Sequence, residues 1–151
     1  MPDTTTLVNE TFAQVLEAMA FMFADPAQHG DLPHDCDRCL RGELTYRGAG
    51  GGGALTLMTS ASVAEELASN LLSLEPGACD PESARDALGE LMNVTLGRLL
   101  TSLAGAAPVF DLAPPNVTPA QAGEWDRMRT DPEAQALVVD GRAILMRFTH
   151  H

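Results

Sequence analysis

A carboxylic acid, a carboxamide and a glycine recur at helical spacing between Asp86 and Gly97. An α-helix turns by about 100° per residue, so Glu90, Asn93 and Gly97 would lie within about 40° of Asp86 on one side of a helix. A carboxylate can pair with a cation, and a carboxamide both donates and accepts hydrogen bonds without carrying charge. Polar residues on an exposed helix face often do no more than contact solvent. The order of these residue types nevertheless makes the stripe a candidate functional surface.

The segment that carries the stripe, roughly Pro81 to Leu103, is predicted to form one long helix. Asp80 supplies a capping acid before the proline at the first helical position. The side opposite the stripe is apolar and is expected to face the core: Ala84, Leu88, Leu91, Met92, Thr95 and Leu99.

Leu96 and Leu100 flank the stripe at positions where a merely solvated face would favour charge. We therefore predict that they contact a partner, together with Asp86 and Gly97. A glycine inside a helix costs about 1 kcal/mol relative to alanine and leaves room for another chain to approach.

Composition limits the classes of function. The 151 residues, 45% of them hydrophobic, are enough for a single domain spanning 1–151, with 1–10 and 150–151 expected to be flexible. A formal charge of −12 disfavours nucleic acid and membrane surfaces as partners. No apolar run approaches the roughly 20 residues of a spanning helix, and the N-terminus lacks the pattern of a secretory signal. We expect a cytoplasmic protein.

The remaining periodicities predict an α+β fold, an antiparallel sheet of hairpin strands with helices packed on one face. The glycine run at 48–53 is expected to be a flexible hairpin connection, because no Lys-Ser/Thr follows it as in a phosphate-binding loop. A loop with one helical turn is expected over 119–130. The other expected elements are helices over 11–24 and from a capping box at 62–65 to about 74, and strands over 41–46, 54–59, 109–112, 135–139 and 142–149.

Cys36 and Cys39 lie two residues apart in a polar loop that also holds His29 and His34. Three cysteines in the chain argue against a disulfide framework. A zinc signature would need a second such pair, and a redox motif would stand at the start of a helix. An incidental loop is the favoured interpretation, and a zinc-dependent module remains an alternative.

The order Asp86-xxx-Glu90-xx-Asn93 resembles the signature of the CheC/CheX/FliY family of chemotaxis phosphatases. That signature continues with a proline further along the chain, and Pro114 and Pro115 fall one or two residues short of its place. Some relatives carry a second Glu-xx-Asn on the first helix. The nearest equivalent here is Glu17-xx-Ala20, which lacks the amide, so the resemblance is to the single-site CheX branch.

The resemblance implies a phosphatase of phosphorylated receiver domains, in chemotaxis or related two-component signalling. Glu90 would pair with the receiver's active-site lysine, and Asn93 would orient the attacking water. It implies no metal or cofactor of the chain's own, with Mg²⁺ held by the receiver, and it implies a homodimer. The alternative is a CheX-like domain that binds receivers as an adaptor without catalysing hydrolysis.

Overall fold

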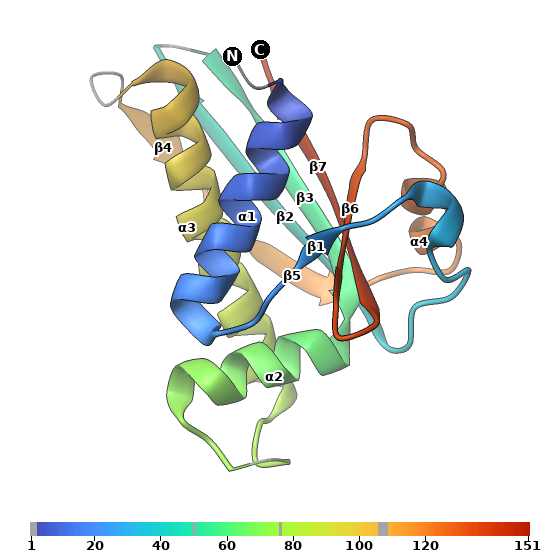
Figure 1. The fold of residues 1–151 in the computed structure, drawn as a ribbon. Coiled ribbons are helices and arrows are strands. Elements are labelled where there is room, and N and C mark those ends of the chain that lie inside the picture. Colours follow the sequence, from blue (N-terminus) through green and yellow to red (C-terminus); the bar gives the residue numbers. More distant parts are fainter. Residues whose placement is uncertain (1–2, 50, 76, 106–108) are drawn as a thin grey trace.

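The computed structural model describes residues 3–49, 51–75, 77–105 and 109–151 (Figure 1). The helices are α1 (Thr4–Ala20), α2 (Ala61–Leu72), α3 (Pro81–Ala104) and the short α4 (Glu124–Arg129), with a 3₁₀ turn at His29–Asp31. The strands are β1 (Asp25–Pro26), β2 (Cys39–Gly48), β3 (Gly51–Ser60), β4 (Phe110–Leu112), β5 (Asn116–Pro119), β6 (Gln135–Val139) and β7 (Arg142–His150).

These strands form one antiparallel sheet in the order β1-β6-β7-β3-β2-β4, with β5 also paired to β2. Helices α1 and α3 lie side by side over one face, and α2 crosses near their ends (Figure 1). Successive strand residues point to opposite faces, so Leu57 joins the main core beneath these helices while Met58 joins a smaller cluster around Trp125 of α4. The predicted α+β fold is confirmed, with α4 added on the second face.

Helix α1 differs from its predicted range of 11–24 at both ends. It begins at Thr4, where the Asp3 side chain accepts a hydrogen bond from the Thr6 amide, so residues 4–10 belong to the helix. It ends because Phe21 adopts a left-handed conformation with φ of 55°. The residues that follow leave the helix axis before Asp25 pairs with β6.

The second helix also begins differently from its prediction. The capping box expected at Ser62 and Glu65 does not form: Ser60 occupies the N-cap position, and Glu65 instead pairs with Arg38, Oε1 to Nη1, at 2.7 Å. The strand pairs β2/β3 and β6/β7 are confirmed. At the turn of the latter, Asp140 and Gly141 both have positive φ, 48° and 75°.

The glycine run is not a separate connection, since Gly48 and residues 51–53 pair within β2 and β3. Residue 50 lies outside the described residues, as do 1–2. At the other end of the chain, His150 belongs to β7, and its Nδ1 lies 2.6 Å from the Tyr46 hydroxyl. Among the helices described, none is both long and apolar enough to cross a membrane.

Candidate functional site

Helix α3 is built from the local signals that predict it. The Asp80 carboxylate accepts a hydrogen bond of 2.7 Å from the Ser83 amide, and Pro81 opens the first turn. This capping lowers the pKa of Asp80, chiefly through the Ser83 backbone N–H. The side predicted to face the core is buried throughout, and Thr95, its polar member, donates a hydrogen bond to the Leu91 carbonyl at 2.8 Å. The result is a rigid, well-anchored platform for the opposite side.

The predicted stripe lies on the outward side of α3. Asp86 and Glu90 are exposed, and Asn93 and Gly97 are partly exposed. Within the described part of the chain, neither the Glu90 carboxylate nor the Asn93 amide forms a hydrogen bond or an ion pair. Both groups therefore keep their full hydrogen-bonding capacity for a molecule that binds from outside.

Leu96 and Leu100 are not part of this surface, so the prediction that they contact a partner is wrong. They are 0% and 3% exposed and belong to the main core. Helix α3 packs against α1, α2 and three strands, β2, β3 and β5. A helix with neighbours on so many sides buries a wider arc than one apolar stripe, and that arc includes both leucines.

A groove between α3 and α1 runs alongside the stripe. It has a volume of about 460 Å³ and is open to solvent. Asn93, Gly97 and Arg98 line it from α3, and Thr11 and Gln14 line it from α1. The presence of Thr11 and Gln14 in this groove could not be predicted from the sequence of α3, because only the packing of the two helices brings them beside Asn93. An open groove of this kind suits a segment of another protein better than an enclosed small molecule.

Pro115 contacts α3 at the residue before Glu90. A Cβ atom added at Gly89 would lie 3.0 Å from Pro115 Cγ, so the proline ring sits directly against the glycine backbone. Gly89 is buried, and Val117 of β5 lies on the same side. This contact fixes the distance between α3 and the segment leading into β5. In the sequence Pro115 stands out only by its spacing from the motif, and nothing there marks Gly89 as its partner.

Helix α1 repeats the burial pattern of α3. This pattern shows which residues of α1 stand where Glu90 and Asn93 stand on α3, and they are not the expected Glu17 and Ala20. Counted from Glu10 in α1 and from Glu90 in α3, the residues at −2, +1, +2, +5 and +6 are all buried. The place of Asn93 is thus taken by Ala13. The pair expected as the nearest equivalent, Glu17 and Ala20, does not fit, because Ala20 is only 1% exposed. In either register the amide is missing.

The cysteine loop does not assemble a metal site in the described residues, where no three His, Cys, Asp or Glu side chains are placed to share an ion. Cys79 lies apart, just before α3, where its thiol faces the Asp80 carbonyl at 3.3 Å.

Comparison with known families decides what this helix platform belongs to. The family model described as chemotaxis phosphatase CheX matches residues 42–134, more than half of the chain and a range that includes Glu90 and Asn93. The chain belongs to the CheX family. A search of curated proteins finds no match.

Solved CheX structures share the fold over nearly the whole chain. The chemotaxis protein CheX from Vibrio vulnificus has a TM-score of 0.73 at 18% identity and covers 99% of this chain and 97% of its own. CheX from Desulfovibrio desulfuricans gives 0.70 at 14%, covering 97% and 98%. A CheX–CheY–BeF₃–Mg²⁺ complex from Borrelia burgdorferi gives 0.67 at 19%, covering 99% and 98%. At these identities the likeness establishes the fold.

Proposed function

We propose that this CheX-family chain hydrolyses the aspartyl phosphate of a phosphorylated receiver domain, using Glu90 and Asn93. The observation that carries the proposal is the pair itself: the exposed Glu90 and the partly exposed Asn93 have no hydrogen-bond or ion-pair partner in the described residues and lie nearly one turn apart on a capped helix. The family name, chemotaxis phosphatase, supports the reaction class. The Borrelia burgdorferi complex of CheX with CheY supports a receiver as the class of partner.

In the proposed mechanism Asn93 positions the attacking water. Phosphoryl transfer passes through a loose transition state, so an in-line water needs correct placement more than it needs a strong base. The carboxamide can hold that water without adding negative charge beside the phosphoryl group. The water oxygen bonds to phosphorus, the acyl P–O bond breaks, and the receiver aspartate is released as a carboxylate with inorganic phosphate.

Glu90 acts in docking and not as a general base, because a carboxylate beside a phosphoryl dianion would be repelled unless a cation lies between them. Its proposed partner is the active-site lysine of the receiver, and that ion pair would set the position of Asn93 over the phosphoryl group. Asp86 lies at the edge of this contact. The Mg²⁺ ion that neutralises developing charge belongs to the receiver in this proposal. The proposed setting is the cytoplasm, with the chain as a homodimer, as the family resemblance implies.

The test is to measure phosphate loss from a panel of receiver domains phosphorylated on aspartate, with and without this protein. At least one receiver should lose phosphate faster, and only when Mg²⁺ is present. Asn93→Ala should remove the acceleration, a loss on the order of 10² or more, while complex formation stays measurable. Glu90→Ala should weaken both binding and rate, because it removes the docking ion pair as well.

Two outcomes would contradict the proposal. Binding without acceleration, equal in the wild type and in Asn93→Ala, would identify the chain as an adaptor that retains a phosphatase fold. Absence of binding to every receiver tested would remove the receiver as partner.

A further inference from the structure

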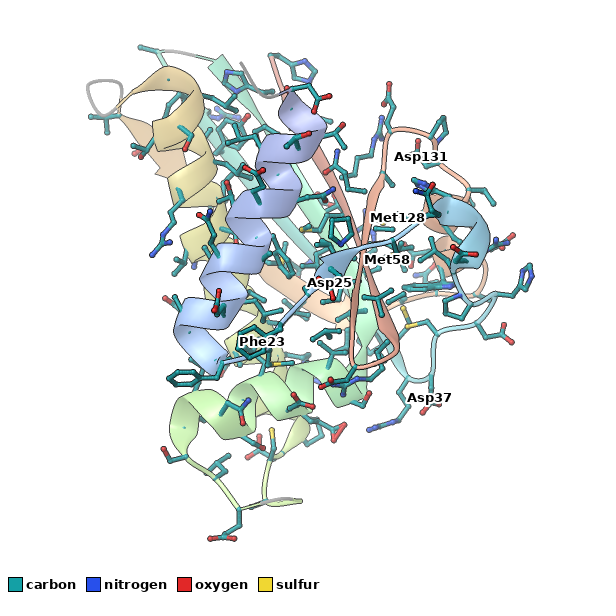
Figure 2. The ribbon with its side chains drawn as sticks, in the orientation of Figure 1. Phe23, Asp25, Asp37, Met58, Met128 and Asp131 are labelled. Atoms are coloured by element: carbon teal, nitrogen blue, oxygen red, sulfur yellow. The ribbon has the colours of Figure 1, made fainter. Side chains whose placement is uncertain are left out.

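Cys36 and Cys39 stand at the two ends of a tight turn that leads into β2, whose first residue is Cys39. Asp37 of this turn is labelled in Figure 2. The turn residues are Asp37 and Arg38, and Arg38 has a left-handed φ of 47°. A β-turn brings the Cα atoms of its first and fourth residues within about 7 Å, and disulfides span Cα separations of about 4.4–6.8 Å. The backbone therefore already holds the two cysteines close to the spacing that a disulfide needs.

The surroundings keep the turn in this conformation. The Arg38 carbonyl accepts a hydrogen bond from the Ala61 amide at 3.0 Å, and the Cys39 carbonyl accepts one from Ala120 at 2.9 Å. The ion pair of Arg38 with Glu65 fastens the turn to α2. Closing a disulfide across a turn that is already formed costs little further ordering.

Both cysteines pack against the same small cluster, and the Cys39 Sγ lies 3.8 Å from the Leu40 carbonyl oxygen. The neighbouring thiol raises the pKa of Cys36 and lowers the pKa of Cys39, the pattern expected when Cys39 is the thiol that ionises first. Burial raises the pKa of Cys36 further. Both side chains are half-buried and line one surface cleft of about 290 Å³, so a small reagent can reach them.

We propose that Cys36 and Cys39 form a redox-active dithiol that closes reversibly to an intramolecular disulfide by exchange with a low-molecular-weight disulfide. The turn geometry and the shared cleft carry this assignment, which is independent of the phosphatase proposal. Two acidic side chains, Asp35 and Asp126, border the cleft. A neutral or cationic disulfide is therefore the chemical class that suits it.

The exchange takes two steps. The Cys39 thiolate first attacks one sulfur of the small disulfide, whose S–S bond breaks, and the released small thiolate takes up a proton. Cys36 then loses its proton and attacks the Cys39 sulfur of the mixed disulfide, releasing a second small thiol. The protein is oxidised by two electrons and loses two hydrogens, and the small disulfide is reduced to two thiols.

Trp125 gives the reaction an internal reporter. It is the single tryptophan of the chain, it is 7% exposed, and both cysteines pack against the small cluster that contains it. Its indole N–H donates a hydrogen bond to the Pro33 carbonyl at 3.0 Å, three residues before Cys36. Closure of the disulfide should change the Trp125 emission, and a dithiol reductant should restore it.

The experiment treats the reduced full chain with cystamine, a small cationic disulfide, and counts free thiols by alkylation and intact mass. Cys36 and Cys39 should both lose their thiols with no cysteamine retained on either, together with the change in Trp125 emission. Cys79 has no second thiol to resolve a mixed disulfide, so cysteamine that it takes up stays attached and is assigned by peptide mapping. In the matched control Cys79→Ser, two thiols should fall to none with the same emission change. In Cys36→Ser, Cys39 should retain cysteamine as a mixed disulfide, because the resolving thiol is gone.

The proposal is overturned if Cys36 and Cys39 both remain free thiols in the wild type. It is equally overturned if cysteamine stays attached to Cys36 or Cys39 in the wild type, or if Cys79 is consumed and chains become cross-linked.

Discussion

Gly97 is the residue on α3 whose identity is least explained by stability. Apart from its chain neighbours and the adjacent backbone of α3, no atom of the described residues lies within 4 Å of a Cβ added there, so packing does not require a glycine. A glycine inside a helix costs about 0.5–1 kcal/mol relative to alanine. Gly97 lines the groove beside Asn93, and the missing side chain leaves that end of the groove open.

Gly97→Ala should therefore stabilise the chain and impair the proposed reaction. Denaturant unfolding should show a gain of about 0.5–1 kcal/mol, from the lower backbone entropy of the unfolded alanine variant. The receiver dephosphorylation assay should show weaker stimulation, because the added methyl group enters the docking surface. A stabilised variant with unchanged stimulation would place Gly97 outside the interface.

Leu96 allows the division of α3 into a core side and an outward side to be measured. Leu96→Ala should lower the free energy of unfolding by roughly 2–5 kcal/mol, because a fully buried side chain leaves a cavity. Asp86→Ala on the exposed stripe should change it by no more than about 0.5 kcal/mol. Equilibrium denaturant curves of the two variants give the comparison. If the two variants had similar free energies of unfolding, the Leu96 side chain would not contribute to the core.

At the scale of elements, sequence signals located the ends of α3 but not those of α1. Asp80 and Pro81 mark the start of α3, Gly105 follows its last residue, and prediction and structure agree within one residue at its C-terminal end. Helix α1 ends at Phe21, in a left-handed conformation that usually calls for glycine or asparagine. An aromatic residue gives no such signal, so the helix predicted from apolar periodicity extended to Ala24, beyond the observed end.

The N-terminal cap of α3 should make its stability depend on pH. Folding lowers the pKa of Asp80, since the Ser83 backbone N–H bonds to its carboxylate. The folded state therefore favours the ionised form, and the stabilisation is complete above the ordinary carboxyl pKa. It is lost as the pH falls through the depressed value.

Asp80→Asn keeps an oxygen that can cap the helix but cannot ionise. In unfolding measurements from neutral pH to about pH 3, the advantage of the wild type over Asp80→Asn should shrink with acidification. Parallel stability profiles for the two proteins would show that the charge of Asp80 contributes nothing.

At the scale of the whole molecule, sequence patterns did not predict which elements distant in the chain pack against one another. Alternating and helical periodicities predicted the α+β class and the hairpins, and the motif spacing predicted that Glu90 and Asn93 lie on the outward side of α3. The groove was not predictable, because Gln14 and Asn93 meet only when α1 and α3 pack side by side (Figure 1). The smaller cluster around Trp125 was not predictable for the same reason. Its residues Met58 and Met128 come from distant segments of the chain that meet on the α4 side of the sheet (Figure 2).

The repeated burial pattern of α1 and α3 leads to a whole-molecule prediction about the number of sites. Glu10 and Glu90 occupy equivalent exposed places, but Asn93 has only Ala13 as its counterpart. A carboxylate with no amide at the position of Asn93, three residues further on, can attract a cation but lacks the group proposed to place the water. Each chain should therefore carry one functional site, on α3.

Glu10→Ala is thus the matched control for Glu90→Ala: the same change, at the same helical position, on the neighbouring helix. Glu10→Ala should leave receiver binding and phosphate release at wild-type levels, whereas Glu90→Ala should reduce both, because only Glu90 has an amide three residues further along its helix. Calorimetric titration with a receiver activated by beryllofluoride should saturate at one receiver per chain. Two receivers per chain, or equal losses in the two variants, would show that α1 presents a second docking surface despite Ala13.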